Sequence, residues 1–163
     1  MNNSIKKILT ITVALALPFL VSTPATADAM ADANGMISKK SHFSVKETLD
    51  KLEAVLKKKG IGVALRWSHD AKAKGVGIPL RPTELLIFGN PKLGSHMFTA
   101  NQTAGIDLPL KALAWKDESG QVWLTYNDPA YIVKRHNIKN RSKIKAKMTG
   151  ALNKLTNVAT GNK

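Results

Sequence analysis

The chain has 163 residues, of which 25 are Lys or Arg, 11 are Asp or Glu and none is Cys. Its formal net charge is +14 at pH 7 and 44% of its residues are hydrophobic, a balance typical of a globular protein rather than a disordered or fibrous one. The absence of cysteine from the sequence excludes disulfides, thiolate nucleophiles and thiolate metal centres. Composition alone favours no particular chemistry.

The first 27 residues have the pattern of a secretory signal peptide. Lys6 and Lys7 give a positive start, an apolar stretch over 8–21 follows, and Ala25-Thr26-Ala27 is the small-x-small pattern that signal peptidase requires. The apolar stretch has 14 residues, whereas a membrane-spanning helix needs roughly 20. We therefore expect cleavage between Ala27 and Asp28 and a periplasmic or secreted protein. An uncleaved N-terminal anchor is the alternative.

The strong positive charge is the second feature of the sequence that bears on function. Cleavage would lower the formal charge from +14 to +12, because the signal peptide contains two lysines and no acid. Such a charge favours contact with polyanions, and export argues against nucleic acid as the partner. For the basic run, a solvated, solubilising face is the first expectation, and contact with an anionic membrane surface or envelope polymer is the second. The run comprises Lys134, Arg135, Lys139, Arg141, Lys143, Lys145 and Lys147.

After the signal peptide, the pattern predicts a flexible lead-in over 28–36 and a single domain over 37–160. The lead-in is small, polar and aperiodic. A strand is expected over 37–43, and Ser44 with Glu47 then forms the S-x-x-E capping box of a helix. The apolar face of that helix repeats at helical spacing, and Gly60 is expected to end the helix as a left-handed cap. The residues of this face are Val45, Leu49, Leu52 and Leu56.

The rest of the domain predicts further strands and helices. Asn90-Pro91 and Asp128-Pro129 each combine a helix cap with a proline in the first turn. The element order is β-α-β-β-α-β-β-α-α, which predicts an α+β fold with an antiparallel sheet and helices packed on one face. The strands are expected at 61–68, 84–88, 110–116 and 121–126, and the helices are expected to begin at Asn90, at Asp128 and at about Asn140.

Ser68-His69-Asp70 has the residue types of a hydrolytic triad. Neighbours on a strand point to opposite faces, so these residues cannot form a catalytic relay there. His69 remains a candidate ligand contact or general base because imidazole titrates near neutral pH, and a histidine that fixes the turn into Asp70 is the alternative. No metal-binding motif occurs, and a metal site would have to be assembled in space from His69, Asp70 and His136. No motif indicates a cofactor.

The segment 88–95 leads from a strand through Gly89 to a helix start, where free backbone N–H groups favour an anion. Lys92 and Ser95 could add contacts, but the segment lacks the spacing of a nucleotide-binding loop, and a tight structural turn is the alternative. Trp67, Trp115 and Trp123 lie in apolar strands rather than among the lysines. They are expected to be core or half-buried sheet residues, which argues against single-stranded nucleic acid as a ligand.

Several segments resemble the domain of unknown function 302 family, over residues 38–158. They are Leu80 to Gly94, Gly105 to Lys111, Val122 to Pro129 and Arg135-His136. The resemblance implies a small α+β domain with a topology like that of the TATA-binding protein, in bacterial proteins that pair as homodimers. It supplies no established reaction. The family places an Asp-His pair where this chain has Ser68-His69, so Asp70 would have to substitute for that acid.

Polar residues at strand ends and helix starts suggest a small cleft, because ligand sites often form there. We expect an exported small-ligand-binding or accessory protein. Binding of an anionic surface through the basic C-terminal helix is the second hypothesis, and an enzyme that uses His69 as general base is the third. The predicted ligand contacts are His69, Asn90, Lys92, Asp107, Asp128, Arg135 and His136.

Overall fold

The computed structural model describes residues 31–163. The predicted signal peptide and the first three residues of the predicted lead-in lie outside the described residues. In chain order the elements are β1 (Met36–Ser41), α1 (Val45–Lys58), β2 (Gly62–Ser68), α2 (His69–Gly75), β3 (Thr83–Gly89), α3 (Pro91–Phe98), the 3-10 helix η1 (Gln102–Ile106), β4 (Leu110–Lys116), β5 (Val122–Asn127), α4 (Pro129–Arg135) and α5 (Ser142–Thr160).

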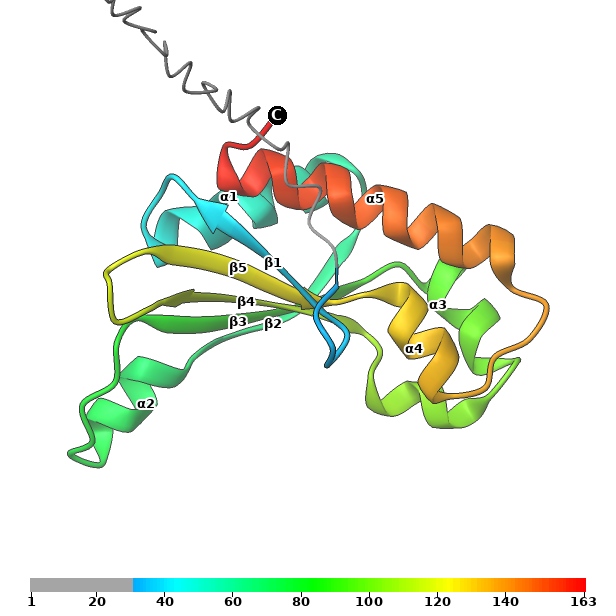
Figure 1. Ribbon diagram of the computed structural model, residues 1–163, viewed down its shortest axis with the longest axis horizontal. Coiled ribbons are helices and arrows are strands. Elements are labelled where there is room, and N and C mark those ends of the chain that lie inside the picture. The colour runs from blue at the N-terminus through cyan, green and yellow to red at the C-terminus, as the bar shows by residue number, and fades with distance from the viewer. Residues whose placement is uncertain (1–30) are drawn as a thin grey trace, which may run out of the picture.

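The five strands form one sheet in the order β1-β5-β4-β3-β2, and every neighbouring pair is antiparallel. Helices α1 and α5 cover one face of this sheet (Figure 1). Helix α2 projects beyond one end of the sheet, whereas α3, η1 and α4 gather at the other end. The predicted α+β fold, with an antiparallel sheet and helices packed on one face, is confirmed.

The main core lies between the sheet and helices α1 and α5. The capping box of α1 is present, because the Glu47 N–H donates to Ser44 Oγ at 3.2 Å and the Ser44 N–H donates to Glu47 Oε2 at 3.1 Å. The helix turns its apolar stripe onto the sheet, and Leu49, Leu52 and Leu56 have no exposed surface. This stripe packs against Leu86 and Phe88 of β3, Ala112 and Ala114 of β4, and Leu152 of α5.

A second, smaller core joins the elements at the far end of the sheet. Met97 of α3, Ala104 of η1 and Ile132 of α4 are buried there with Leu108 and Met148. These residues come from four short segments and from α5, so this core fixes the positions of the loops around it. Asp107 and His136, which are described below, directly follow η1 and α4.

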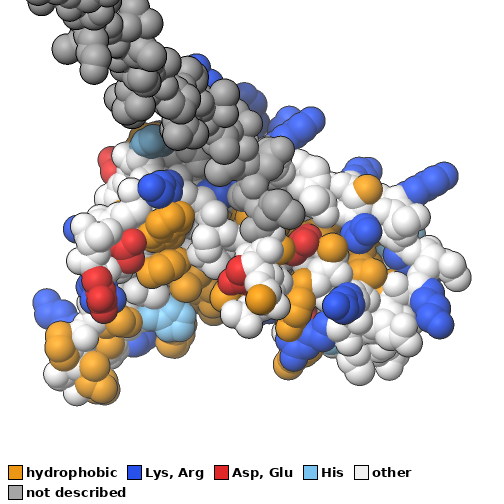
Figure 2. Space-filling model, in the orientation of Figure 1, with side chains coloured by type: hydrophobic (Ala, Val, Ile, Leu, Met, Phe, Trp, Pro, Cys, Tyr) orange, Lys and Arg blue, Asp and Glu red, His pale blue; other side chains and the backbone are white. Residues whose placement is uncertain are grey.

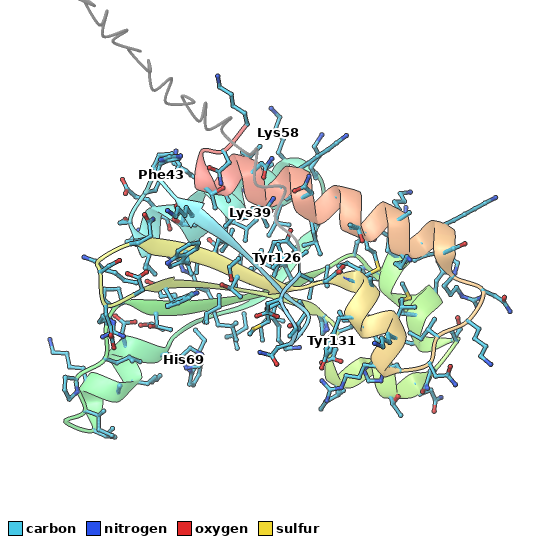
Figure 3. The ribbon with its side chains drawn as sticks, in the orientation of Figure 1. Lys39, Phe43, Lys58, His69, Tyr126 and Tyr131 are labelled. Carbon is cyan, nitrogen blue, oxygen red and sulfur yellow. The ribbon has the colours of Figure 1, made fainter. Side chains whose placement is uncertain are left out.

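Buried polar side chains hold the helices to the sheet. Lys39 of β1 is only 6% exposed, and its ammonium donates to the side chains of Asn153 and Asn157 on α5 at 2.6 and 2.5 Å. Figure 3 shows Lys39 beneath α5, on the helix-covered side of the sheet. Arg66 of β2 binds Asp50 of α1 at 2.6 Å and Glu84 of β3 at 2.8 Å. Hydrogen bonds from Lys46 and Arg66 lower the pKa of Asp50 below its usual range.

The other face of the sheet has no helix laid across it in the described part of the chain. The strand register places Trp67, Leu85, Leu113 and Thr125 in one row across this face. Trp115 and Trp123 stand directly opposite each other on β4 and β5. The indole N–H of Trp115 donates to Thr125 Oγ1 at 2.9 Å, and that of Trp123 donates to Asp117 Oδ2 at 2.7 Å. We call this surface the open face.

Three details differ from the sequence-based expectations. Residues 69–75 form the additional helix α2. No apolar periodicity predicts this helix, because none of its residues is buried. The end of the predicted flexible lead-in is a hydrogen-bonded turn, in which Asp32 Oδ1 accepts from the N–H groups of Asn34 and Met36. Trp67 is 40% exposed rather than half-buried, and Lys72 stands 5.0 Å from the centre of its ring.

Candidate functional site

Three of the seven predicted contact residues meet in one polar cluster, in which Asp107 and His136 are buried and the Arg135 side chain is half-exposed. Asp107 is 8% exposed and His136 is 6% exposed. Asp107 Oδ2 lies 2.6 Å from Nε2 of His136, and Asp107 Oδ1 accepts from Arg135 Nη1 at 3.2 Å. Asp107 follows η1 directly and His136 follows α4 directly, so the cluster ties the ends of these two helices together.

Two residues that the sequence analysis did not single out complete this cluster. Oγ1 of Thr103 lies 2.8 Å from Nδ1 of His136 and 2.9 Å from Oδ1 of Asn101, and the Asn101 side chain donates to the His136 carbonyl at 2.8 Å. The Thr103 hydroxyl can donate to neutral His136, or it can accept from the imidazolium and donate to Asn101. Both charge states of His136 therefore keep their hydrogen bonds.

The structure does not bring the other four predicted contacts to this cluster. Asn90 and Asp128 are helix caps: Asn90 accepts from the Lys92 N–H and Asp128 accepts from the Ala130 N–H, each at 2.9 Å. Lys92 is exposed on the first turn of α3. His69 is exposed at the start of α2, on the opposite side of the sheet from α5 (Figure 3). The seven residues therefore do not form one continuous polar cleft.

Ser68, His69 and Asp70 adopt a helix-capping geometry rather than a relay. Ser68 is the N-cap of α2, and its hydroxyl donates to Asp70 Oδ1 at 2.7 Å. His69 and His136 belong to α2 and the end of α4, which lie at opposite ends of the sheet (Figure 1). The metal site considered for His69, Asp70 and His136 is therefore not assembled. Among residues 31–163, no group of three His, Asp or Glu side chains is placed to hold a metal ion.

An apolar pocket lies beside the small core, and the sequence analysis did not predict it. It has a volume of about 380 Å³, within the range of small-molecule sites. Its walls come from the start of β2, the end of β3, α3, the segment before β4, and α5. Asn90 and Ser95 are the polar side chains among the described residues that line it. The remaining side chains of its wall include Val63, Phe88, Leu93, Phe98, Leu108, Leu110, Met148 and Leu155.

At three positions of the pocket wall, the backbone conformation does not require glycine. Gly62, Gly89 and Gly94 line the pocket, and none of them has a positive φ. A Cβ on Gly62 would lie 3.7 Å from the Gly89 carbonyl, and a Cβ on Gly94 would lie 3.6 Å from the Phe98 ring. Both are ordinary contacts. Glycine within a strand or helix costs stability, so the feature that these two positions provide is open space in the wall.

The fold and these two sites define a small α+β protein with a polar cluster and an apolar pocket that both adjoin its smaller core. The chain belongs to the family described as Domain of unknown function DUF302, whose model matches residues 37–155. This confirms the resemblance found in the sequence. Within the described residues, no helix has the length and apolar character needed to cross a membrane.

Among curated proteins, the chain is similar to part of longer relatives. It is 46% identical over 119 residues to "Fluoride-specific ion channel FluC 1" of Brucella suis biovar 1 (strain 1330), a match that covers 72% of this chain and 47% of the relative. The protein of the same name from Brucella abortus biovar 1 (strain 9-941) is also 46% identical over 119 residues, with 72% and 44% covered. The chain thus spans less than half the length of these relatives.

Among solved structures, the fold is similar to that of an uncharacterized conserved DUF302 protein from Bacillus stearothermophilus. The TM-score is 0.69 with 22% sequence identity, and the match covers 77% of this chain and 98% of the other. At this identity the likeness concerns the fold alone.

Proposed function

We propose that this protein is an exported small-ligand-binding or accessory protein of the bacterial envelope, and that its ligand is apolar. The observation that carries the proposal is the apolar pocket with glycines in its wall. A wall of this composition offers little to a sugar or a nucleotide, because buried polar groups need hydrogen-bond partners. An apolar group that enters it gains the free energy of leaving water.

The binding of N-phenyl-1-naphthylamine tests this proposal. This neutral probe fluoresces strongly only in apolar surroundings, so we expect a saturable increase in its fluorescence with the purified protein. Gly94→Leu places a side chain in the pocket wall and should abolish the increase. Gly150→Leu is the matched control, because Gly150 also lies within a helix and nothing lies within 4 Å of a Cβ built there. Equal fluorescence with both variants would refute the pocket as the binding site.

Export is supported by the N-terminal sequence. The positive start, the short apolar stretch and the small-x-small motif together favour cleavage after Ala27. An exported protein without cysteine also needs no oxidative folding. The relatives from Brucella are named as fluoride channels, but the match covers less than half of each. The proposal for this chain therefore rests on its own pocket and not on their name.

A second candidate function is binding to an anionic surface through α5. The 19 residues of this helix include Lys143, Lys145, Lys147 and Lys154 and no Asp or Glu. Figure 2 shows Lys and Arg side chains projecting from the end of the molecule that α5 reaches. Vesicles that contain anionic lipid should bind the protein at low salt and release it as salt rises. Binding that does not respond to salt would count against this function.

We further propose that two copies pair through the open face. Met36, Leu65 and Trp67 are each about two-fifths exposed on this side of the molecule, and α2 is followed by exposed Val76, Ile78 and Leu80. Contiguous exposed apolar patches larger than those of typical monomers mark interaction sites. Native mass spectrometry should show a dimer that Trp67→Lys converts to monomer. A monomer at all concentrations would exclude the pairing.

A further inference from the structure

We propose that the ligand of the apolar pocket is an anionic amphiphile, with a single alkyl chain of about ten to twelve carbons in the pocket and a carboxylate or phosphate head group at a rim of three lysines. This inference rests on the proposed binding function and specifies its ligand class. The chain is assigned from the volume and composition of the pocket, and the head group from the charges around it.

The volume of the pocket limits the length of the chain. One water molecule occupies about 30 Å³ of the liquid, and a methylene group is of similar size. The pocket, at about 380 Å³, thus holds on the order of twelve such groups. Most of the side chains in its wall are apolar, so each methylene that enters gains from burial, which corresponds to about a fourfold gain in affinity per group. That gain should end once the pocket is full.

Three lysines stand next to residues of the pocket wall, and all three are exposed. Lys92 lies between Pro91 and Leu93 at the start of α3, and both of these neighbours line the pocket. Lys147 precedes the lining Ala151 by four residues and Lys154 follows it by three. These spacings put Lys147, Ala151 and Lys154 on neighbouring positions of the α5 surface. The two lysines of α5 therefore flank the pocket along one edge.

No acidic residue offsets these charges on the two helices concerned. The sequences of α3 and α5 contain no Asp or Glu, and none is found among the lining residues of the described chain. Asp107, next to the lining Leu108, is held by His136 and Arg135. The local field at the rim is therefore positive, and it complements a negative head group attached to a chain in the pocket.

Displacement of N-phenyl-1-naphthylamine by matched ten-carbon compounds tests the inference. The probes are decanoate, decyl phosphate, 1-decanol and decyltrimethylammonium, which share one chain and differ in head-group charge. At low salt we expect the two anions to displace the dye at about tenfold lower concentration than the alcohol, and the cation to be weakest. At 1 M salt the screening length falls to about 3 Å, and the preference over the alcohol should disappear.

Lysine variants provide the matched controls. Replacing Lys92, Lys147 and Lys154 by Gln should remove the preference for anions and leave the affinity for 1-decanol unchanged. Replacing Lys74 on α2 and Lys116 on β4, which lie away from the pocket, by Gln should leave the preference intact. Across a series of carboxylates from eight to sixteen carbons, affinity should rise about fourfold per methylene and level off near twelve carbons.

The outcomes separate this inference from the function on which it rests. If Gly94→Leu abolishes dye binding and the alcohol displaces the dye as well as the anions do, the pocket is an apolar site. The proposal of an anionic head group is then wrong. If the dye does not bind at all, the proposed function itself fails. A preference for decyl phosphate alone would identify a phospholipid-derived ligand, and equal displacement by decanoate would identify the free fatty acid class as sufficient.

Discussion

The Asp107→Ala variant should unfold much more easily than the native protein. Its carboxylate is 8% exposed and contacts both His136 at 2.6 Å and Arg135 at 3.2 Å. Removing the carboxylate leaves the buried Nε2 of His136 without its hydrogen-bond partner, and an unpaired buried polar group costs up to about 3 kcal/mol. Arg135 adds less than about 1 kcal/mol because its side chain is half-exposed. We therefore expect a loss of about 3 kcal/mol.

Urea unfolding followed by tryptophan fluorescence measures this loss. With a slope of about 2 kcal/mol per M, the midpoint should fall by about 1.5 M. Asp128→Ala is the matched control, since Asp128 caps α4 through one hydrogen bond to Ala130, and the loss of a cap costs about 1 kcal/mol. In a double-mutant cycle, Asp107→Ala and His136→Ala should be coupled by about 2 kcal/mol. A loss below about 1 kcal/mol for Asp107→Ala would refute a buried, structurally essential pair.

Three further predictions concern other parts of the chain. Hydrogen bonds from Ser119 and Trp123 lower the pKa of Asp117 from 3.8 to about 2. The stability that Asp117 contributes is therefore present above pH 4 and is lost as the pH falls toward 2. The difference in unfolding free energy between the native protein and Asp117→Asn should vanish over that interval. Gly94→Ala should raise the unfolding free energy by up to about 1 kcal/mol, and a loss of stability in urea unfolding would mean that the fold needs this glycine. After expression of the full chain in a bacterium, N-terminal sequencing of the periplasmic fraction should begin at Asp28, whereas a start at Met1 would contradict cleavage.

Features that depend on neighbours in sequence were predictable. The capping box of α1, the Asn90-Pro91 and Asp128-Pro129 helix starts and the left-handed Gly60 all appear in the structure. Each is decided by contacts within four residues, so local chemistry suffices. Helix α2 escaped detection for the opposite reason. It buries no residue, and without an apolar face a short helix gives no periodic signal.

The candidate site was predictable only in part. Asp107, Arg135 and His136 lie together, but Thr103 and Asn101, which complete their hydrogen bonds, are common polar residues of a loop and carry no distinctive pattern. The pocket is harder still to foresee, because its wall combines five separate segments of the chain. The visible trace in the sequence is Gly94, a helix breaker inside a predicted helix. Such a conflict with local propensity often marks a functional site.

The polar cluster and the pocket are joined by the backbone between them. Asp107 is followed by Leu108 and Pro109, and both of these residues line the pocket. The contacts of Asp107 with His136 thus fix one wall of the ligand site although Asp107 is not in that wall. We expect folded Asp107→Ala to bind N-phenyl-1-naphthylamine several-fold more weakly than the native protein, because the wall can shift.

Asp128→Ala separates this positioning effect from a general loss of stability. It weakens the same small core, since Asp128 caps α4, but it leaves the Asp107–His136 pair and the Leu108 wall in place. Binding should therefore be close to native in Asp128→Ala when both variants are measured at a temperature where they are fully folded. If the two variants lose affinity to the same extent, stability alone accounts for the effect. If only Asp107→Ala loses it, the buried pair shapes the pocket.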